Sequence, residues 1–232
     1  MPRRARQTPA GYIYHVLNRA AGRIALFRKD ADYAAFQRVM LLAHQLVPLR
    51  ILDWCIMKNH WHFIVWPQTD IQVTDFFRWL AHTHAMRWRV SRRTVGWGHL
   101  YQGRFKAFPI QTNRHFLTVC RYVQRNALTA GVVNRAEHWP WSSLWTRRQG
   151  SPEFRGMLTE WPVPRPPNWL ELVNTPLTAK ELARVRLSAT RGRPYGDPAW
   201  VQQTAKELDL EHTLRREGRP SKSEDQEQPH EN

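Results

Sequence analysis

The pair of histidines in His60-Trp61-His62 is the feature of the sequence with the clearest chemical potential. The triplet follows a tight turn, Lys58-Asn59, and continues into a run of apolar and aromatic residues typical of a β-strand. Alternate side chains of a strand lie on the same face, so both imidazoles point one way while Trp61 points into the core. Two imidazoles on one rigid face can bind a single divalent metal ion. Two unrelated histidines are the alternative interpretation.

A second pair, His82 and His84, has the same spacing but a different setting. It falls in a segment whose apolar residues recur at helical spacing. On a helix the two rings point about 200° apart, so they cannot bind one ion together. We interpret this second pair as structural.

A tyrosine on an amphipathic segment is the next candidate for chemistry. Residues 113–130 carry an apolar stripe at spacings of three and four, which predicts a helix: Phe116, Val119, Cys120, Val123, Ala127 and Ala130. Tyr122 and Asn126 are four residues apart and share the flank of that stripe, with His115 upstream on the same flank. A tyrosine there can face a site beside a sheet. An amphipathic tyrosine at a helix–sheet boundary is the alternative.

The elements that must position these residues can be read from the same patterns. Strands are predicted at residues 11–18, 50–57, 60–66 and 105–111, and helices at 29–47, 73–90 and 113–130. Their order predicts an α+β fold: a ferredoxin-like, mostly antiparallel sheet with helices packed on it.

The chain is expected to divide into a main domain, residues 1–150, and a smaller C-terminal part. Six prolines between positions 152 and 176 predict that residues 151–176 form a proline-rich linker, a connecting arm without packed elements. Two short helices are expected in an accessory module over residues 177–217. The polar residues 218–232 are expected to be a disordered tail.

The charge of the chain indicates a polyanionic partner. The 232 residues contain 35 Lys and Arg against 19 Asp and Glu, a formal net charge of +16. Residues 1–150 hold 23 of these basic residues and 6 of the acidic ones, a net of +17, together with nine of the 12 tryptophans. Cations interleaved with large aromatic rings suit single-stranded nucleic acid, which offers phosphates and unstacked bases. A basic domain whose aromatic residues all lie in the core is the alternative.

Composition also excludes several classes of protein. A hydrophobic content of 42% excludes a wholly disordered basic protein. The sequence contains no run of 18 or more apolar residues, so no membrane-spanning helix is predicted. Cys55 and Cys120 lie in apolar segments and are interpreted as core residues. The basic N-terminus precedes no apolar signal region, so we expect a cytoplasmic, nucleoid-associated protein with no membrane partner.

Four segments, in this order and spacing, resemble a known family. Met57–Phe63 resembles the His-hydrophobic-His ("HUH") motif of single-tyrosine transposases, with Lys58 where a proline often stands and a bulky Trp61. The stretch from Tyr122 to Val133 resembles their nucleophile helix. The segments 140–143 and 192–196 are similar to those of the REP-associated tyrosine transposases. The resemblance covers roughly residues 10–217.

The resemblance implies a reaction and the residues that carry it. His60 and His62 hold Mg²⁺ or Mn²⁺, with Asn126 as the third protein ligand and Gln124 as the fallback. Tyr122 attacks a scissile phosphate and forms a 5′-phosphotyrosine, so that single-stranded DNA is nicked and rejoined at repeat hairpins.

Further basic residues are candidates for contacts with single-stranded or hairpin DNA, by a monomer or a homodimer. They are Arg104 and Lys106 on one strand face, Arg121 and Arg125 on the polar side of the tyrosine helix, Arg3 and Arg4 in an N-terminal arm, and Arg193 near the C-terminal helices. Arg87, Arg89, Arg92 and Arg93 form a basic run at a helix end, for which a solvated face is an equal alternative.

Two other functions stay open from the residues alone. One is a non-catalytic protein that binds DNA or RNA hairpins. The other is a zinc-dependent hydrolase built on His60 and His62. It is disfavoured because Asp53, on the neighbouring strand, is the one acidic residue near them.

Overall fold

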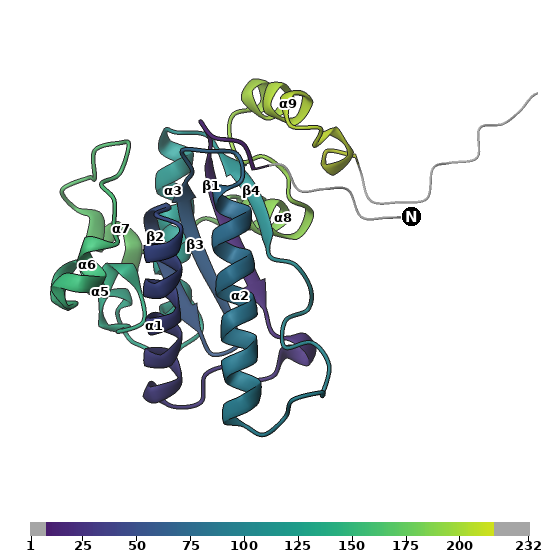
Figure 1. The fold of residues 1–232 in the computed structure, drawn as a ribbon. Helices are drawn as coiled ribbons and strands as arrows, with labels where there is room; N and C mark the ends of the chain where they lie inside the picture. The colour runs from purple at the N-terminus through teal and green to yellow at the C-terminus, as the bar shows by residue number, and fades with distance from the viewer. Residues whose placement is uncertain (1–7, 216–232) are drawn as a thin grey trace, which may run out of the picture.

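A four-stranded antiparallel sheet lies at the centre of the protein in the computed structural model, which describes residues 8–215 (Figure 1). Its strands are β1 (Ile13–Arg19), β2 (Arg50–Met57), β3 (His60–Trp66) and β4 (Lys106–Ile110). They run in the order β2-β3-β1-β4, and every neighbouring pair is antiparallel. This order, with one helix after β1 and one after β3, confirms the predicted ferredoxin-like α+β fold.

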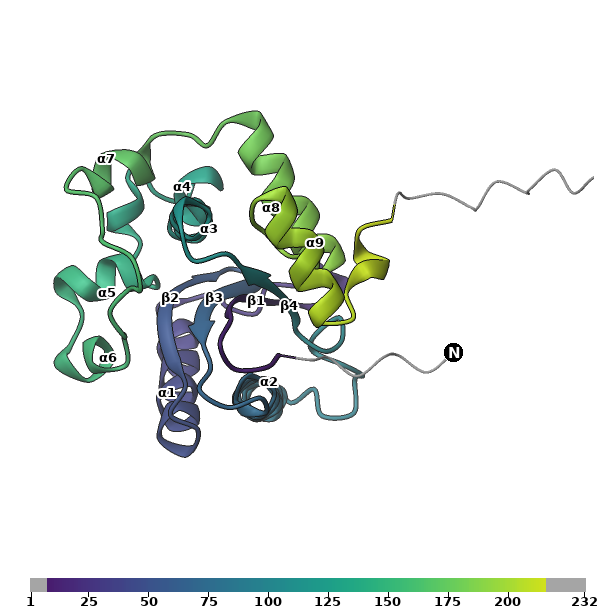
Figure 2. The same ribbon diagram turned by 90° about the horizontal axis from the view of Figure 1, so that it is seen from above.

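Helices cover both faces of the sheet (Figure 2). One face carries α1 (Asp30–Leu46) and α2 (Gln72–Ser91), and the other carries α3 (Arg114–Gln124), α4 (Asn126–Thr129) and α8 (Ala179–Arg191). The shorter helices are α5 (Ser143–Gln149), α6 (Pro152–Gly156), α7 (Trp169–Asn174) and α9 (Pro198–Glu207), and 3₁₀ turns occur at Ala21–Arg23, Ala136–His138 and Glu211–Thr213. None of the described helices has the length and apolar character needed to cross a bilayer.

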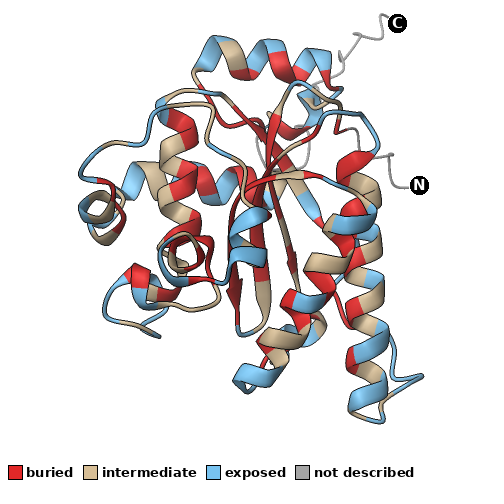
Figure 3. Ribbon diagram, turned by 60° about the vertical axis from the view of Figure 1, so that its left-hand side comes forward, coloured by how far each residue is buried: buried red, intermediate tan, exposed pale blue. Residues whose placement is uncertain are grey.

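The alternation of side chains along β3 sends its residues into two different cores. Trp61 and Phe63 pack under α1 and α2, and the Trp61 ring stacks on Phe77 with centroids 5.4 Å apart. Ile64 belongs to the opposite core, together with α3. Figure 3 shows that residues of the sheet are buried while the outer sides of the helices are exposed. The sheet is buried because it lies between two layers of helices.

The helix predicted over residues 113–130 is divided at Arg125 into α3 and α4. The side chain of Asn126 donates a hydrogen bond to the carbonyl of Tyr122 at 2.9 Å. Such a bond from a side chain back to the preceding turn competes with regular helical pairing, which explains the irregularity. Gly131 follows with a φ of +67° and ends the segment, as a glycine in this position is expected to do.

The prediction that residues 151–176 form an unpacked arm is wrong. Trp169 and Val173 of α7 are buried in the core on the α3 side. The Thr159 N–H donates to the Ile51 carbonyl at 2.8 Å, so the segment lies along the outer edge of β2. The high proline content is misleading because the prolines stand between the residues that pack. Each proline removes one backbone N–H donor but does not prevent its neighbours from being buried.

The predicted pair of short C-terminal helices is confirmed as α8 and α9. The loop between them covers the other edge of the sheet. Its Tyr195 N–H donates to the carbonyl of Pro109, and the Gln111 N–H donates back to the Tyr195 carbonyl, both at 2.9 Å. C-terminal segments therefore protect both edge strands from pairing with another chain. The predicted tail, residues 218–232, lies outside the described residues.

Candidate active site

A polar cavity of about 720 Å³ opens on the α3 face of the sheet, at the C-terminal end of β1 and the start of β3. It brings together six of the residues that the sequence singled out: His60, His62, Tyr122, Asn126, Arg104 and Lys106. The remaining lining residues are Leu17, Asn18, Arg19, Gln102, Gly103, Arg186, Ala189 and Thr190. The predicted site is thus one place in the structure, formed by three strands, α3, α4 and α8.

His62 is held by a buried partner that the sequence analysis did not identify. Its Nδ1 lies 2.9 Å from Nε2 of His15 on the neighbouring strand β1, and the two rings are nearly parallel. The Nε2 of His62 is buried and has no hydrogen-bond partner. A buried nitrogen without a partner is costly unless another group completes its coordination. His62 is therefore oriented through one nitrogen and unsatisfied at the other.

His60 is fixed in a corresponding way by neighbouring amides. Its Nδ1 lies 2.7 Å from Oδ1 of Asn59 in the β2–β3 turn. A side-chain hydrogen bond also links it to Asn126. Because the amide nitrogen of Asn126 already donates to the helix backbone, its side-chain carbonyl oxygen is the atom that faces the His60 imidazole. Two imidazoles and one amide oxygen converge on the cavity.

The histidines of the site are neutral at physiological pH. Burial lowers the pKa of His60 to about 4, with a further contribution from Arg19. Burial also lowers the pKa of His62 well below its ordinary value, and that of His15 to about 3. The neutral imidazole is the form that ligates metals. At neutral pH, protons therefore compete only weakly with a metal ion for these nitrogens.

Tyr122 lies over the histidines with its ring edge-on. Its centroid is 5.7 Å from that of His62 and 6.1 Å from that of His15, both nearly perpendicular. Burial raises the pKa of Tyr122, while the charges of Arg186 and Arg19 oppose that rise. The hydroxyl is therefore protonated at neutral pH, next to two cations that favour its ionised form.

The family of the chain follows from its sequence pattern. Residues 9–126 match the family model described as "Transposase IS200 like", which covers half of the chain and both histidines, Tyr122 and Asn126. The chain belongs to the IS200-like transposase family. Among solved structures, the fold of this transposase is similar to that of a REP-associated tyrosine transposase bound to a REP hairpin, with a TM-score of 0.52. The two chains are 17% identical, and the match covers 77% of this chain and 96% of the other. Among curated proteins, none matches the chain.

Two arginines expected to meet phosphates have other partners in the transposase. Arg121 donates to the carbonyls of Leu172, Thr175 and Pro176, and Arg125 donates to those of Val173 and Asn174. These are the free carbonyls at the C-terminus of α7, where cations are favourable. The structure thus shows both guanidiniums bonded to the protein's own backbone, and their contact with DNA stays a prediction. The partner helix lies in the proline-rich segment, which the sequence predicts to be unpacked.

Gln124 and Asp53 form a separate buried network on the other side of α3. Nε2 of Gln124 donates to Asp53 at 2.6 Å, and its Oε1 accepts from the Trp169 indole at 2.8 Å. Ser143 also donates to Asp53. Neither residue lines the cavity, so Gln124 does not serve as the fallback ligand, and Asp53 does not supply the base of a hydrolase.

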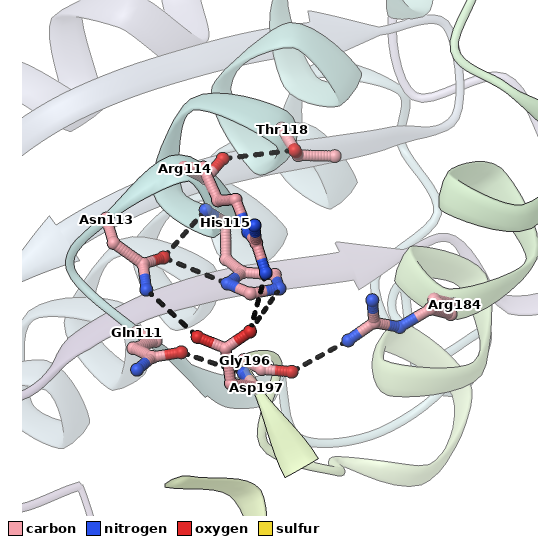
Figure 4. A network of polar contacts seen from close by, with 8 residues as sticks. All are labelled: Gln111, Asn113, Arg114, His115, Thr118, Arg184, Gly196 and Asp197. Atoms are coloured by element: carbon pink, nitrogen blue, oxygen red, sulfur yellow. Dashed lines mark hydrogen bonds and ion pairs between the residues drawn. The ribbon is translucent and has the colours of Figure 1, made fainter.

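His115 lies on the Tyr122 side of α3 but seven residues upstream, in a network of its own (Figure 4). Its Nδ1 is 2.9 Å from Oδ1 of Asn113, and Asp197 accepts a hydrogen bond from Arg114 at 2.8 Å. This network holds the loop before α9 against the start of α3. Arg193, in the same loop, is not among the residues that line the cavity. Arg3 and Arg4 lie outside the described residues.

Two cations of the cavity, Arg19 and Arg186, are absent from the predicted site. Arg19 could have been found, because it alternates with His15 and Leu17 on one face of β1, the strand that pairs with β3. In the observed register, Arg19 is opposite His60. No sequence signal distinguishes Arg186 from the other basic residues of α8. It reaches the cavity through the packing of α8 beside β4.

Proposed function

We propose that this transposase nicks and rejoins single-stranded DNA at repeat hairpins, with Tyr122 as the nucleophile. One observation carries the proposal: the Tyr122 ring packs edge-on against His62 in a cavity that four cations line. These cations are Arg19, Arg104, Lys106 and Arg186. A tyrosine, a pair of neutral imidazoles and a cationic wall are the groups that transfer of a DNA phosphate to a side chain requires.

In the proposed step, Oη of Tyr122 attacks the phosphorus of a scissile phosphodiester. The bond between phosphorus and the 3′ oxygen breaks, and a 5′-phosphotyrosine forms. The phenolic proton leaves the tyrosine, and the released 3′ oxygen takes up one proton to become a hydroxyl. The number of phosphodiester bonds is conserved, so the reverse reaction with another 3′-hydroxyl rejoins a strand without an energy source.

His60, His62 and Asn126 are the residues that would hold a divalent metal ion. The unpartnered Nε2 of His62 and the neutral state of both imidazoles fit this role. No described group of three His, Cys, Asp or Glu residues could bind a metal by itself, so water and a DNA phosphate would complete the coordination. A bound ion supplies Lewis-acid polarisation of the phosphate. Without a carboxylate the donor set is poor for Mg²⁺, and we expect Mn²⁺ to bind more tightly.

The chain's own arginines address the difficulty of using tyrosine at neutral pH. Burial disfavours the phenolate, and Arg19 and Arg186 lie close enough to lower the pKa of Tyr122 in opposition to it. The same guanidiniums can bind the phosphate oxygens and neutralise charge as it develops. Lys106, which donates to the Thr190 carbonyl at 3.2 Å, holds α8 at the rim of the cavity.

The proposed partner is a DNA hairpin with unpaired flanks, bound in the cytoplasm at the nucleoid by a monomer or a homodimer. A hairpin is the partner of the similar solved structure. The excess charge of residues 1–150 supports a phosphate-rich partner, whose binding weakens steeply with salt.

The test is an adduct assay. Labelled hairpin DNA with unpaired flanks is incubated with the protein and Mn²⁺ or Mg²⁺, then denatured and separated by electrophoresis. We expect a covalent adduct for the wild type and none for Tyr122→Phe. For His60→Ala we expect cleavage at least about 100-fold slower, with DNA affinity changed less than about twofold, because phosphate contacts supply most of the affinity.

A non-catalytic hairpin-binding protein predicts the opposite pattern. It binds DNA equally well with either residue replaced and forms no adduct across varied hairpin sequences. An adduct that persists in Tyr122→Phe would show a different nucleophile. Loss of DNA affinity in His60→Ala would make the metal structural.

A further inference from the structure

An exposed apolar patch lies at the end of α2 and in the loop that follows it. Four of the nine large hydrophobic residues that are exposed among the described residues lie between positions 86 and 97. They are Met86, Val90, Val95 and Trp97, with exposed fractions of 50%, 61%, 64% and 75%. Isolated exposed apolar residues are ordinary, but a cluster that includes a largely exposed tryptophan indicates a binding surface.

The surroundings of the patch are cationic. The sequence has no Asp or Glu between Asp75 and Glu137. Arg87 and Arg93, within the patch, are both exposed. A partner for this surface must therefore combine apolar groups with negative charge.

Two other arginines of the same run hold the loop in place. Arg92 forms an ion pair with Asp32 at 2.9 Å and lies over the Trp88 ring at 4.2 Å. Arg89 donates to the carbonyls of Trp97 and Gly98 at 3.3 and 3.1 Å. The backbone that presents the Trp97 ring is thus anchored to α2, although the ring itself is exposed. The surface is preformed, which lowers the entropy cost of binding.

The loop that carries part of the patch leads along the chain to the active site. The loop that carries Trp97 continues into Gln102, Gly103 and Arg104, which line the cavity of the tyrosine and the histidines. A second hollow of about 650 Å³ shares Gly103 and Arg104 with that cavity and extends to His99, two residues after Trp97. Its floor is largely apolar and includes Phe77 and Ala85.

We propose that this surface binds the unpaired DNA strand that leaves the active site, with Trp97 as a platform on which a base stacks. The inference rests on the proposed function and extends it to a second contact region. Aromatic rings bind unpaired bases without sequence preference, and nearby arginines bind the phosphates between them. A second copy of the chain fits less well, because pairing this surface with itself would bring two cationic surfaces together.

The experiment compares two probes by fluorescence anisotropy: a hairpin with unpaired extensions on both sides, and the same hairpin without them. We expect Trp97→Ala to weaken binding of the extended hairpin about tenfold, the effect of one lost stacking contact. Binding of the hairpin without extensions is expected to change less than about twofold. Trp97→Phe, which keeps an aromatic ring, restores most of the affinity. Leu46→Ala, which removes a similarly exposed apolar side chain from α1, leaves both affinities unchanged.

Three results would overturn the inference. One is equal affinity of Trp97→Ala and wild type for the extended hairpin, and another is an equal loss for both probes. The third is a change of oligomeric state in Trp97→Ala by analytical ultracentrifugation, which would assign the patch to a second copy. Failure of the proposed function is seen separately, in the adduct assay carried out with saturating DNA. Under those conditions Trp97→Ala still forms the Tyr122 adduct, whereas a chain that lacks the proposed chemistry forms none in either variant.

Discussion

The two faces of the central sheet are built from the same strands but have different chemistry. On the α1 and α2 face, Trp61 and Phe63 of β3 pack into a closed aromatic core. That core also buries one histidine, His84, whose Nδ1 lies 2.7 Å from the Tyr101 hydroxyl. On the α3 face, His60 and His62 of the same strand line an open polar cavity. A single alternating strand thus contributes stability on one side and reactive groups on the other.

This difference explains why a bulky residue can stand between the two histidines. Trp61 is fully buried, and its indole donates to the Tyr101 hydroxyl at 3.1 Å. The strand is therefore held rigidly from one face, while on the other face His15 and Asn59 orient the two histidines. We therefore expect replacements on the α1 and α2 face to lower the free energy of unfolding, and replacements on the α3 face to lower activity with little effect on stability.

The largest effect is expected for the residue that anchors the strand. Trp61→Ala removes a fully buried indole from a packed core, and we expect a loss of about 3–5 kcal/mol in the free energy of unfolding. Urea denaturation followed by circular dichroism measures this loss. The matched replacement on the other face, His60→Ala, should change the free energy of unfolding by less than about 1 kcal/mol. Similar losses for both variants would mean that the two faces do not differ in this way.

A smaller effect is expected for His15, the histidine that orients the proposed metal ligand His62. Nε2 of His15 can accept a hydrogen bond from Nδ1–H of His62, which leaves the other nitrogen of His62 free for a metal ion. His15→Leu removes that acceptor, and we expect metal affinity to fall about 10- to 100-fold, as for other residues that orient metal ligands. Isothermal titration calorimetry with Mn²⁺ measures the affinity. His15→Gln, which keeps an acceptor, should recover part of it; equal losses in both would indicate a packing effect alone.

The smallest effect concerns the buried histidine of the aromatic core. Burial lowers the pKa of His84 to about 3, against about 6.5 in the unfolded chain. Between these values the unfolded chain binds a proton that the native protein excludes, so the stability that His84 contributes is complete above pH 6.5 and declines on acidification. At pH 5 the expected loss from this residue is about 2 kcal/mol.

Urea unfolding at pH 7 and pH 5 measures the decline. His15, His60 and His62 have lowered pKa values as well, so the wild type should lose more than this single contribution. His84→Gln should lose about 2 kcal/mol less than the wild type over the same interval. Identical declines in the two proteins would contradict the low pKa of His84.

The sequence predicts the parts of this molecule that depend on local patterns. The bounds of β2 and β3 agree with the predicted 50–57 and 60–66, and Cys55 and Cys120 are buried and free as expected. Strand and helix periodicity place His60 on one face with His62, and Tyr122 on one face with Asn126. The resemblance to single-tyrosine transposases, and not periodicity, implies that the two pairs form one site.

The partners that come from distant segments could not be predicted in the same way. His15 and Arg19 meet the site through the register of β1 on β3, which no short pattern encodes. Arg121 and Arg125 contact α7, a helix inside the proline-rich segment. Helical periodicity places both arginines on the polar side of the predicted helix and so predicts that they are exposed, whereas the structure shows them bonded to backbone carbonyls. Long-range packing determined each of these outcomes.

The central claim is that the open face of the sheet carries a tyrosine that joins covalently to DNA. The most direct measurement is mass spectrometry of the adduct formed with hairpin DNA and Mn²⁺, after digestion with a nuclease and trypsin. Cleavage after Arg121 and Arg125 releases a peptide of Tyr122, Val123, Gln124 and Arg125. We predict that this peptide carries a nucleotide through a 5′-phosphate on Tyr122. A nucleotide found on any other residue, or an unmodified Tyr122 peptide as the only form in the purified adduct, would contradict the account.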